Sequence, residues 1–210
     1  MPASGPQPEQ PSEIWIAPIR DAAGPQATAR RLVSDGQMPH LSPDGRWVAY
    51  VRQGHAYLIP ATGDAERDLG EGGCTVWSPD GTRLAMCDPS DRVFILTVAD
   101  ASRRYIPTGS GANDPTAWSP DGTELALTSM RDGNGEIYLI GVDGANDRRL
   151  TNAPGDQSAD AWLPEGLLVT SSSPGADESD WFLVDPASGA PSRFLWMEGL
   201  PNPIAYAPGQ

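Results

Sequence analysis

The chain has 210 residues and a formal net charge of −14, from 28 acidic against 14 basic side chains. Such an acidic composition excludes nucleic acid as an expected partner, because phosphate binding draws on a basic surface. No apolar run approaches the length that a membrane span requires, and 23 glycines with 22 prolines indicate a soluble domain rich in turns.

The N-terminal stretch, MPASGPQPEQPS, is polar and rich in proline. We expect residues 1–12 to be a disordered tail, and they lack the basic start and apolar stretch of a signal peptide. The segments Glu13–Ile16 and Arg30–Leu32 are then predicted to be two short strands. They place a partial repeat at residues 13–35.

A short phrase recurs four times after this segment: LSPDGRWVAY at 41–50, WSPDGTRLAM at 77–86, WSPDGTELAL at 118–127 and a divergent copy, WLPEGLLVT, at 162–170. Each copy predicts a hairpin, in which proline fixes φ at the corner and Asp-Gly tolerates the positive φ of a tight turn. Successive copies are about 40 residues apart, the period of a four-stranded propeller blade. The predicted corner residues are Pro43, Asp44, Gly45, Pro79, Asp80, Gly81, Pro120, Asp121, Gly122, Pro164 and Gly166.

Two further strands follow each hairpin, as in Val93–Val98 and Arg104–Ile106 of the second copy. Second strands such as Leu84–Cys87 are apolar at consecutive positions, which is typical of a sheet covered on both faces. The repeat therefore predicts an all-β propeller of four-stranded antiparallel blades, forming a single domain over residues 13–210. The full blades are expected at 36–72, 73–108, 109–151 and 152–198, with a second partial blade at 199–210.

Recurring tryptophans and arginines outside the corners are given structural roles. Trp77, Trp118 and Trp162 are predicted to pack between blades. Pairs of arginines fall on the fourth strands, where we expect them to meet solvent or neighbouring acids. These pairs are Arg30–Arg31, Arg103–Arg104 and Arg148–Arg149.

The phrase W-SPDG-xx-LA, together with SMRDGNGEIYLIGVDGANDRRLT at 129–151, resembles the repeat of the TolB-type β-propellers. It is also similar to the propeller domains of prolyl-oligopeptidase-like peptidases. The resemblance covers roughly residues 13–208. It implies protein partners, of which a lipoprotein of the cell envelope is one in that family, and a periplasmic or extracellular location.

The two partial repeats leave the closure of the ring open. Strands from both ends of the chain can complete one blade and close a five-bladed ring. Alternatively, the chain is a truncated piece of a six-bladed ring, which needs about 240 residues at about 40 residues per blade. We favour truncation, because rings of the TolB type usually have six blades.

Cys74 and Cys87 lie on either side of the second corner. If the hairpin is regular, they face each other across the strand pair, so a disulfide and two reduced, buried thiols are both open. A zinc site needs two further ligands, and the two histidines of the chain show no ligand spacing. The segment Asp132–Glu136 begins like a calcium loop, but Ile137 stands where that loop needs glycine. We therefore expect no metal and no cofactor.

The sequence contains no G-x-S-x-G motif, so we expect no peptidase activity and no enzyme in this chain. The predicted function is that of a non-catalytic scaffold for protein–protein interaction. One alternative is a propeller that gates or supports a hydrolase or peptidase domain absent from this chain. Another is a sugar-active propeller enzyme, which predicts two carboxylates about 5–10 Å apart near the central axis.

The loops after the second strands vary most from copy to copy, lengthening from Arg52–Gly54 to Ser171–Asp180. Repeat proteins commonly place their binding insertions on one such face. The loops of the third and fourth copies are therefore predicted to flank a ligand surface, although acidic, solvated loops without a ligand are equally supported. The candidate partner-binding residues are Arg131, Asp132, Asn134, Asp177, Glu178 and Asp180.

Overall fold

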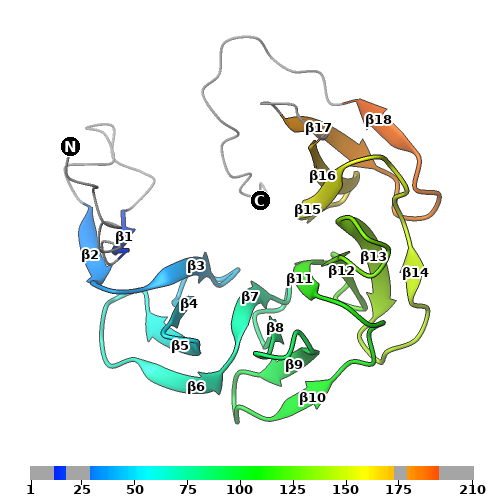
Figure 1. Cartoon of the computed structure of the whole chain (residues 1–210). Coiled ribbons are helices and arrows are strands. Elements are labelled where there is room, and N and C mark those ends of the chain that lie inside the picture. Colours follow the sequence, from blue (N-terminus) through cyan, green and yellow to red (C-terminus); the bar gives the residue numbers. More distant parts are fainter. Residues whose placement is uncertain (1–11, 18–28, 173–178, 194–210) are drawn as a thin grey trace, which may run out of the picture.

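The computed structural model describes residues 12–17, 29–172 and 179–193 of the chain. These residues form 18 β-strands, and none of them lies in a helix. Four sheets of four antiparallel strands stand side by side in an arc, and a two-stranded sheet lies at one end of it (Figure 1). The all-β propeller that the repeat predicts is confirmed. The described residues hold no helix of the length and apolar character that a bilayer span needs.

Each four-stranded sheet is one blade, with its strands in chain order from the axis to the rim (Figure 1). The first blade contains β3 (Gln37–Leu41), β4 (Trp47–Arg52), β5 (His55–Pro60) and β6 (Arg67–Glu71). The second contains β7 (Gly73–Trp77), β8 (Arg83–Cys87), β9 (Val93–Thr97) and β10 (Arg103–Tyr105). The third contains β11 (Asn113–Trp118), β12 (Glu124–Ser129), β13 (Glu136–Gly141) and β14 (Arg148–Arg149). The fourth contains β15 (Asp156–Leu163), β16 (Gly166–Ser172), β17 (Ser179–Val184) and β18 (Pro191–Arg193).

The two-stranded sheet pairs β1 (Ile14–Ile16) with β2 (Arg30–Val33) and packs against the first blade. Each four-stranded sheet lies within one repeat unit of the sequence. The tail expected at 1–12, apart from Ser12, and the partial blade expected at 199–210 lie outside the described residues. The number of blades in the ring therefore stays a prediction.

Apolar side chains form a separate layer between each pair of neighbouring sheets. The second strand of a blade supplies two of these layers, because its side chains alternate between the two faces of the sheet. Leu84 and Met86 of β8 pack toward the first blade, whereas Ala85 packs toward the third. All three are fully buried. This double burial explains the consecutive apolar residues in the sequence, and each buried leucine contributes about 1.5–3 kcal/mol.

The repeated tryptophans lie between blades, as the sequence predicts. The indole Nε1 of Trp77 donates to the carbonyl of His40, and that of Trp118 donates to the carbonyl of Val76, each at 3.0 Å. Both acceptors lie on the innermost strand of the preceding blade. Trp162 is partly buried in the layer between the third and fourth blades. The indole therefore contributes apolar area and a satisfied polar group to the same interface.

An aspartate closes the turn in each of the first three corners. In the second corner, Ser78 Oγ donates to Asp80 Oδ1 at 2.6 Å, and the backbone N–H of Thr82 donates to the same oxygen at 2.9 Å. These hydrogen bonds stabilise the carboxylate and lower the pKa of Asp80 to about 2. Asp44 and Asp121 accept equivalent bonds in the first and third corners. The recurrence of Ser-Pro-Asp-Gly thus reflects one hydrogen-bonded turn used three times.

The fourth corner is built differently, because its sequence has lost the serine and the aspartate. Leu163 pairs directly with Gly166, which leaves Pro164 and Glu165 as a two-residue turn. Gly166 has a φ of 150°, and a Cβ atom there would lie 2.8 Å from the carbonyl oxygen of Val184. This close approach explains why the glycine is kept where the rest of the motif is not.

A row of arginines on the fourth strands ties each blade to the next one at the rim. Each donates from its guanidinium to a backbone carbonyl near the turn after the third strand of the following blade. The donor and acceptor pairs are Arg30 to Ala61, Arg67 to Val98, Arg104 to Val142 and Arg148 to Pro186. The expectation that the arginine pairs meet solvent or acids is therefore wrong for Arg30 and Arg104. Arg148 does form an ion pair with an acid, Glu124, at 2.5 Å. Arg31 and Arg149 do meet acids, Glu13 and Glu136.

Candidate interaction surface

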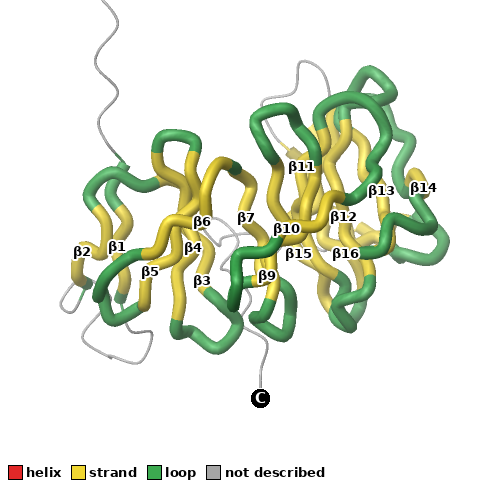
Figure 2. Tube along the Cα trace, turned by 90° about the horizontal axis from the view of Figure 1, so that it is seen from below, coloured by secondary structure: helices red, strands yellow, loops and turns green. Residues whose placement is uncertain are grey.

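The connections between strands gather on two faces of the propeller, which Figure 2 shows edge-on. The corner face carries the turns after the first and third strands of each blade. The loop face carries the connections after the second strands and those between blades. Three of the predicted partner-binding residues, Arg131, Asp132 and Asn134, lie in the β12–β13 connection on the loop face.

Arg131 follows β12 on the loop face, but its side chain is used inside the protein. The guanidinium lies 3.8 Å from the ring centroid of Tyr138 and 2.8 Å from the carboxylate of Asp147. It also donates to Asn113 Oδ1 at 3.2 Å. Only 13% of this side chain is exposed. Arg131 therefore holds its loop in place and leaves few donors for a partner.

Asp132 and Asn134 in the same loop also have internal partners. The carboxylate of Asp132 accepts from the hydroxyl of Tyr138 and forms an ion pair with Arg149 at 2.9 Å. The side-chain amide of Asn134 donates to the carbonyl of Gly155 at 2.5 Å. These contacts join the β12–β13 loop to the connection before the fourth blade. The loop is rigid support for the face, and its side chains are largely occupied.

The acidic part of the prediction stays a prediction. Asp177 and Glu178 lie outside the described residues. Asp180 lies on β17, where its backbone pairs with Ser171, and its side chain is outside the described part of the structure.

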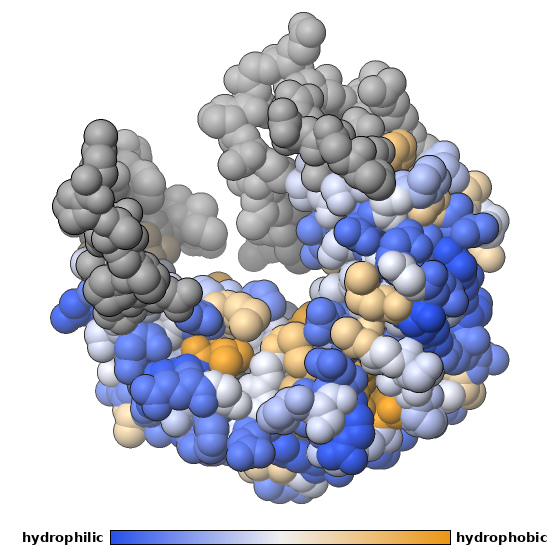
Figure 3. All heavy atoms as spheres, viewed as in Figure 1, coloured by the Kyte–Doolittle hydropathy of each residue, from blue (hydrophilic) through white to orange (hydrophobic). Residues whose placement is uncertain are grey.

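On the face seen in Figure 3, hydrophilic residues cover most of the rim, and apolar residues lie nearer the middle of the arc. Large apolar side chains are exposed at a few described positions, including Met38, Leu41 and Tyr105. Single exposed apolar residues are ordinary on protein surfaces, so exposure alone selects none of them. Among these side chains, Met130 lines a smaller hollow beside β15, and Tyr105 lines a hollow between the second and third blades.

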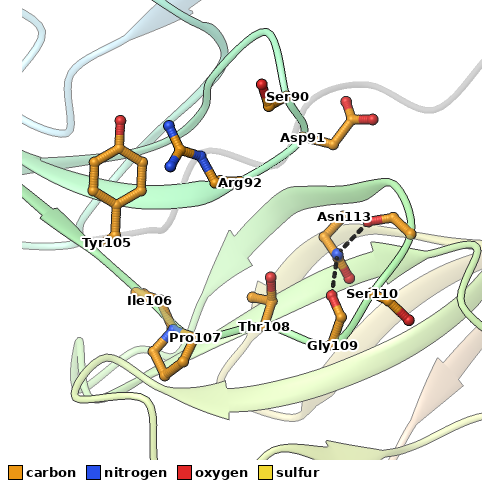
Figure 4. Close-up of a pocket in the computed structure, with 11 residues that line it drawn as sticks. Ser90, Asp91, Arg92, Tyr105, Ile106, Pro107, Thr108, Gly109, Ser110 and Asn113 are labelled. Atoms are coloured by element: carbon orange, nitrogen blue, oxygen red, sulfur yellow. Dashed lines mark hydrogen bonds between the residues drawn. The ribbon is translucent and has the colours of Figure 1, made fainter.

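That hollow is an open groove of about 440 Å³ on the loop face between the second and third blades. One wall is the β8–β9 loop, and the other is the connection from β10 to β11 (Figure 4). The residues that line it are Ser90, Asp91, Arg92, Tyr105, Ile106, Pro107, Thr108, Gly109, Ser110, Gly111 and Asn113.

Arg92 and Tyr105 form the most prominent pair of side chains in the groove. The guanidinium carbon of Arg92 lies 4.6 Å from the ring centroid of Tyr105, a cation–π contact. The ring of Tyr105 in turn packs against Phe94, which is fully buried, with 5.5 Å between ring centroids. Tyr105 remains 45% exposed. The pair is thus anchored in the core and presented to solvent.

Asp88 fixes the position of Arg92. The two side chains form an ion pair at 2.6 Å, and the backbone N–H of Ser90 donates to the same carboxylate at 2.9 Å. Burial alone raises the pKa of Asp88, but the hydrogen bonds from Arg92 and Ser90 outweigh it and lower the pKa to about 2. The carboxylate therefore stays charged at neutral pH and keeps the guanidinium over the tyrosine ring.

The opposite wall of the groove is held by Asn113 and Arg131. The side-chain amide of Asn113 donates to the carbonyls of Gly109 and Gly111, at 3.0 and 2.6 Å (dashed lines in Figure 4). A Cβ atom on Gly109 would lie 2.7 Å from the guanidinium of Arg131. Arg131 therefore supports the groove from behind, which is a different role from the direct contact that the sequence predicts.

Sequence reasoning missed this groove because much of its surface is backbone. One signal was present: the connection at 106–112 is rich in glycine and serine, whereas only Gly72 separates β6 from β7. A longer inter-blade connection predicts an extra loop on the loop face, even though it does not predict a hollow.

The two cysteines do not occupy the register that the sequence predicts. A β-bulge between Gly73 and Val76 makes Gly73 the partner of Cys87 and leaves Cys74 in the bulge, with a φ of 53°. The regular pairing assumed for the hairpin is therefore wrong at this end of β7. Both side chains are free thiols in the structure.

Comparisons with known proteins agree with the architecture. A model of the TolB β-propeller domain family matches residues 73–205, which is more than half of the chain. A protein of Agrobacterium tumefaciens assigned as TolB is 18% identical, with a TM-score of 0.60 over 86% of this chain and 87% of that one. TolB from Acinetobacter baumannii is 19% identical, with a TM-score of 0.59 over 77% of this chain and 41% of that one.

An enzyme structure is also similar. Puromycin hydrolase is 15% identical, with a TM-score of 0.62 over 82% of this chain and 31% of that one. At these identities the similarity to solved structures shows a shared fold alone. No curated protein sequence matches the chain.

Proposed function

Because the chain belongs to the TolB β-propeller domain family, we propose that it is a non-catalytic scaffold that binds another protein. The contact surface is the groove on the loop face between the second and third blades. One observation carries the proposal: the groove presents Arg92 and Tyr105 to solvent in a fixed arrangement. Arginine and tyrosine are among the residues most enriched at the energetic centres of protein interfaces.

The shape of the groove favours an extended polypeptide segment as its occupant. Its floor and second wall run from Thr108 to Gly111, where small side chains let another backbone approach closely. Because internal contacts already hold Tyr105 and Arg92, binding costs little side-chain entropy at these positions. An apolar or aromatic side chain of the partner would pack on the exposed ring of Tyr105.

A scaffold role is supported further by the placement of the titratable groups. Both histidines of the chain lie in the first blade, on β3 and β5, whereas the groove lies between the second and third blades. The hydroxyl groups that line the groove, on Ser90, Thr108 and Ser110, therefore have no histidine of this chain as a general base. The family also supports a periplasmic or extracellular location as part of the proposal.

The proposal is tested by replacing Tyr105 with alanine in the full 210-residue chain. Wild-type and variant proteins are immobilised and exposed to an envelope extract of the source cells, and a retained protein is then purified and titrated against each. Loss of a central interface aromatic costs about 2 kcal/mol or more, so we expect about a thirtyfold rise in Kd. The matched control is Leu41→Ala, because Leu41 is 54% exposed but lies beside the first corner.

Binding that Leu41→Ala preserves and Tyr105→Ala weakens supports the groove. A partner bound equally by both variants overturns the assignment of the surface. Circular dichroism of each variant confirms that the blades remain folded before binding is compared.

The similarity to puromycin hydrolase favours a second candidate function, in which this propeller supports a hydrolase domain of a longer polypeptide. That candidate predicts a serine hydrolase segment in the same reading frame. Sequencing the transcript on both sides of the codons for residues 1–210 tests it, since a reading frame with no hydrolase segment on either side removes the candidate.

A further inference from the structure

Two cysteines and an aspartate from three strands meet at the loop-face end of the second blade. Cys74 lies on β7, Cys87 ends β8, and Asp114 lies on β11 of the third blade. The two sulfur atoms and a carboxylate oxygen all lie within 4.8 Å of one another. Cys74 Sγ donates to Asp114 Oδ1 at 3.2 Å. Cys87 is buried, Cys74 is half-buried and Asp114 is exposed, so solvent reaches the cluster from one side.

The bulge in β7 turns the Cys74 side chain toward this cluster. The first blade has a similar bulge in β3, where Met38 occupies the position of Cys74 with a φ of 49°. The bulge is therefore a shared feature of these two blades, whereas the thiols and the carboxylate are particular to the junction of the second and third blades. The fold itself does not require sulfur at this position.

The cluster gathers groups that become anionic, and no described cation balances them. None of the ion pairs in the described part of the chain includes Asp114. Two thiols and a carboxylate therefore lie close together with no described cation to balance them, and these are donor groups that a thiophilic metal binds.

We propose that Cys74, Cys87 and Asp114 bind a divalent cation of the zinc type, with water as the fourth ligand. Zinc accepts two thiolates and a carboxylate in tetrahedral geometry, which puts the donor atoms about 3.6–3.8 Å apart at Zn–S and Zn–O distances of about 2.3 and 2.1 Å. To reach this geometry, Cys74 Sγ and Asp114 Oδ1 would move apart slightly from 3.2 Å, and any donor pair near the 4.8 Å limit would move together. Calcium and magnesium do not suit this site, because they require oxygen donors and two of its three side-chain ligands are thiolates.

The site explains why the sequence alone predicts no zinc. Asp114 lies 40 residues from Cys74 and outside any ligand motif, so only the packing of neighbouring blades brings it to the thiols. Bound metal would join the innermost strands of the second and third blades. Asn113, the neighbour of Asp114, lines the groove, so the ion would also stiffen one wall of that groove.

The test is an anaerobic titration of the reduced 210-residue chain with Co²⁺, a spectroscopic substitute for zinc. We expect tetrahedral visible bands and a thiolate charge-transfer band in the near ultraviolet, both displaced by Zn²⁺ with release of protons. Asp114→Asn should weaken binding by about tenfold or more. Cys87→Ser should abolish the charge-transfer band, and Cys74→Ser, at a half-buried position, provides the same test if Cys87→Ser does not fold.

The matched control is Asp160→Asn, which removes an innermost-strand carboxylate of β15 that bonds Thr170. This variant should bind Co²⁺ like the wild type. The proposal is overturned if fully reduced protein with two titratable thiols shows no charge-transfer band, or if Asp114→Asn binds as tightly as Asp160→Asn. It is also overturned if protein purified without reductant and with added zinc carries a Cys74–Cys87 disulfide by mass spectrometry.

Discussion

The corner face and the loop face of this propeller connect the same strands in different ways, with repeated turns on the corner face and variable connections on the loop face. On the corner face, three turns repeat one pattern of hydrogen bonds around Asp44, Asp80 and Asp121. On the loop face, the described connections differ widely in length: Gly72 alone joins the first blade to the second, whereas residues 106–112 join the second to the third. Repetition therefore marks what holds each blade together, and variation marks where a groove and a thiol cluster are found.

The largest expected effect tests whether side chains at equivalent positions of the repeat contribute equally to the free energy of unfolding. Trp118 is 5% exposed and bonds the preceding blade, whereas Leu41, at the same place in the first copy, is 54% exposed. Trp118→Ala should lower the free energy of unfolding by about 3–5 kcal/mol. Leu41→Ala should change it by less than about 0.5 kcal/mol. Urea unfolding followed by circular dichroism measures both, and similar losses would contradict a layer that depends on burial.

The next effect concerns a loop-face residue that behaves like a core residue. Arg131→Leu removes the cation–π contact with Tyr138 and leaves Asp147 and Asn113 without their partner. We expect a loss of about 2–3 kcal/mol in the free energy of unfolding. Arg46 is the control, because its side chain is 81% exposed and 3.8 Å from Asp44. Arg46→Leu should cost about 0.5 kcal/mol or less, and an equal cost for both would show that Arg131 is not a support.

A smaller effect depends on pH and distinguishes the intact corners from the divergent one. The pKa of Asp80 falls from 3.8 to about 2 on folding. Its contribution is therefore fully present above about pH 4 and lost as the pH falls through about 2. Since its side chain is 54% exposed, the stabilisation is screened to about 1 kcal/mol. Asp80→Asn should cost this amount at pH 7, progressively less as the pH falls through about 2, and nothing well below pH 2.

Glu165→Gln is the matched control in the fourth corner, where the Leu163–Gly166 pair closes the turn without a carboxylate. It should not alter the pH dependence of urea unfolding. A loss as large as that of Asp80→Asn would mean that net charge, and not the turn, sets the dependence.

The parts of this structure that could be predicted from the sequence are those in which side-chain pattern and backbone geometry coincide. The pair Asp80-Gly81 predicts a tight turn, and the apolar run Leu84–Cys87 predicts a strand that is buried on both faces. The bulge at Cys74 could not be predicted, because an extra residue in one strand leaves the alternation of the other strand intact.

The hydrogen bonds between blades could not be predicted from the sequence for a different reason. Arg67 and Arg104 bind backbone carbonyls of the following blade, and a carbonyl has no signature in the sequence. The groove is likewise walled in part by backbone, from Thr108 to Gly111. Sequence reasoning named Arg131 on the loop face as a candidate contact, and the structure adds that its guanidinium is held by Tyr138, Asp147 and Asn113.

The last prediction concerns two substitutions that should barely change the free energy of unfolding but should differ in their effect on partner binding. Ser110 is an exposed residue at the edge of the groove, and Glu165 is an exposed residue of the fourth corner. Tryptophan at either position should change the free energy of unfolding by about 0.5 kcal/mol or less, because neither side chain is packed. Ser110→Trp nevertheless fills space that a partner segment would occupy. Titration of the partner should therefore show about a tenfold or larger rise in Kd for Ser110→Trp and none for Glu165→Trp. Equal binding by both variants would mean that the partner meets another part of the propeller.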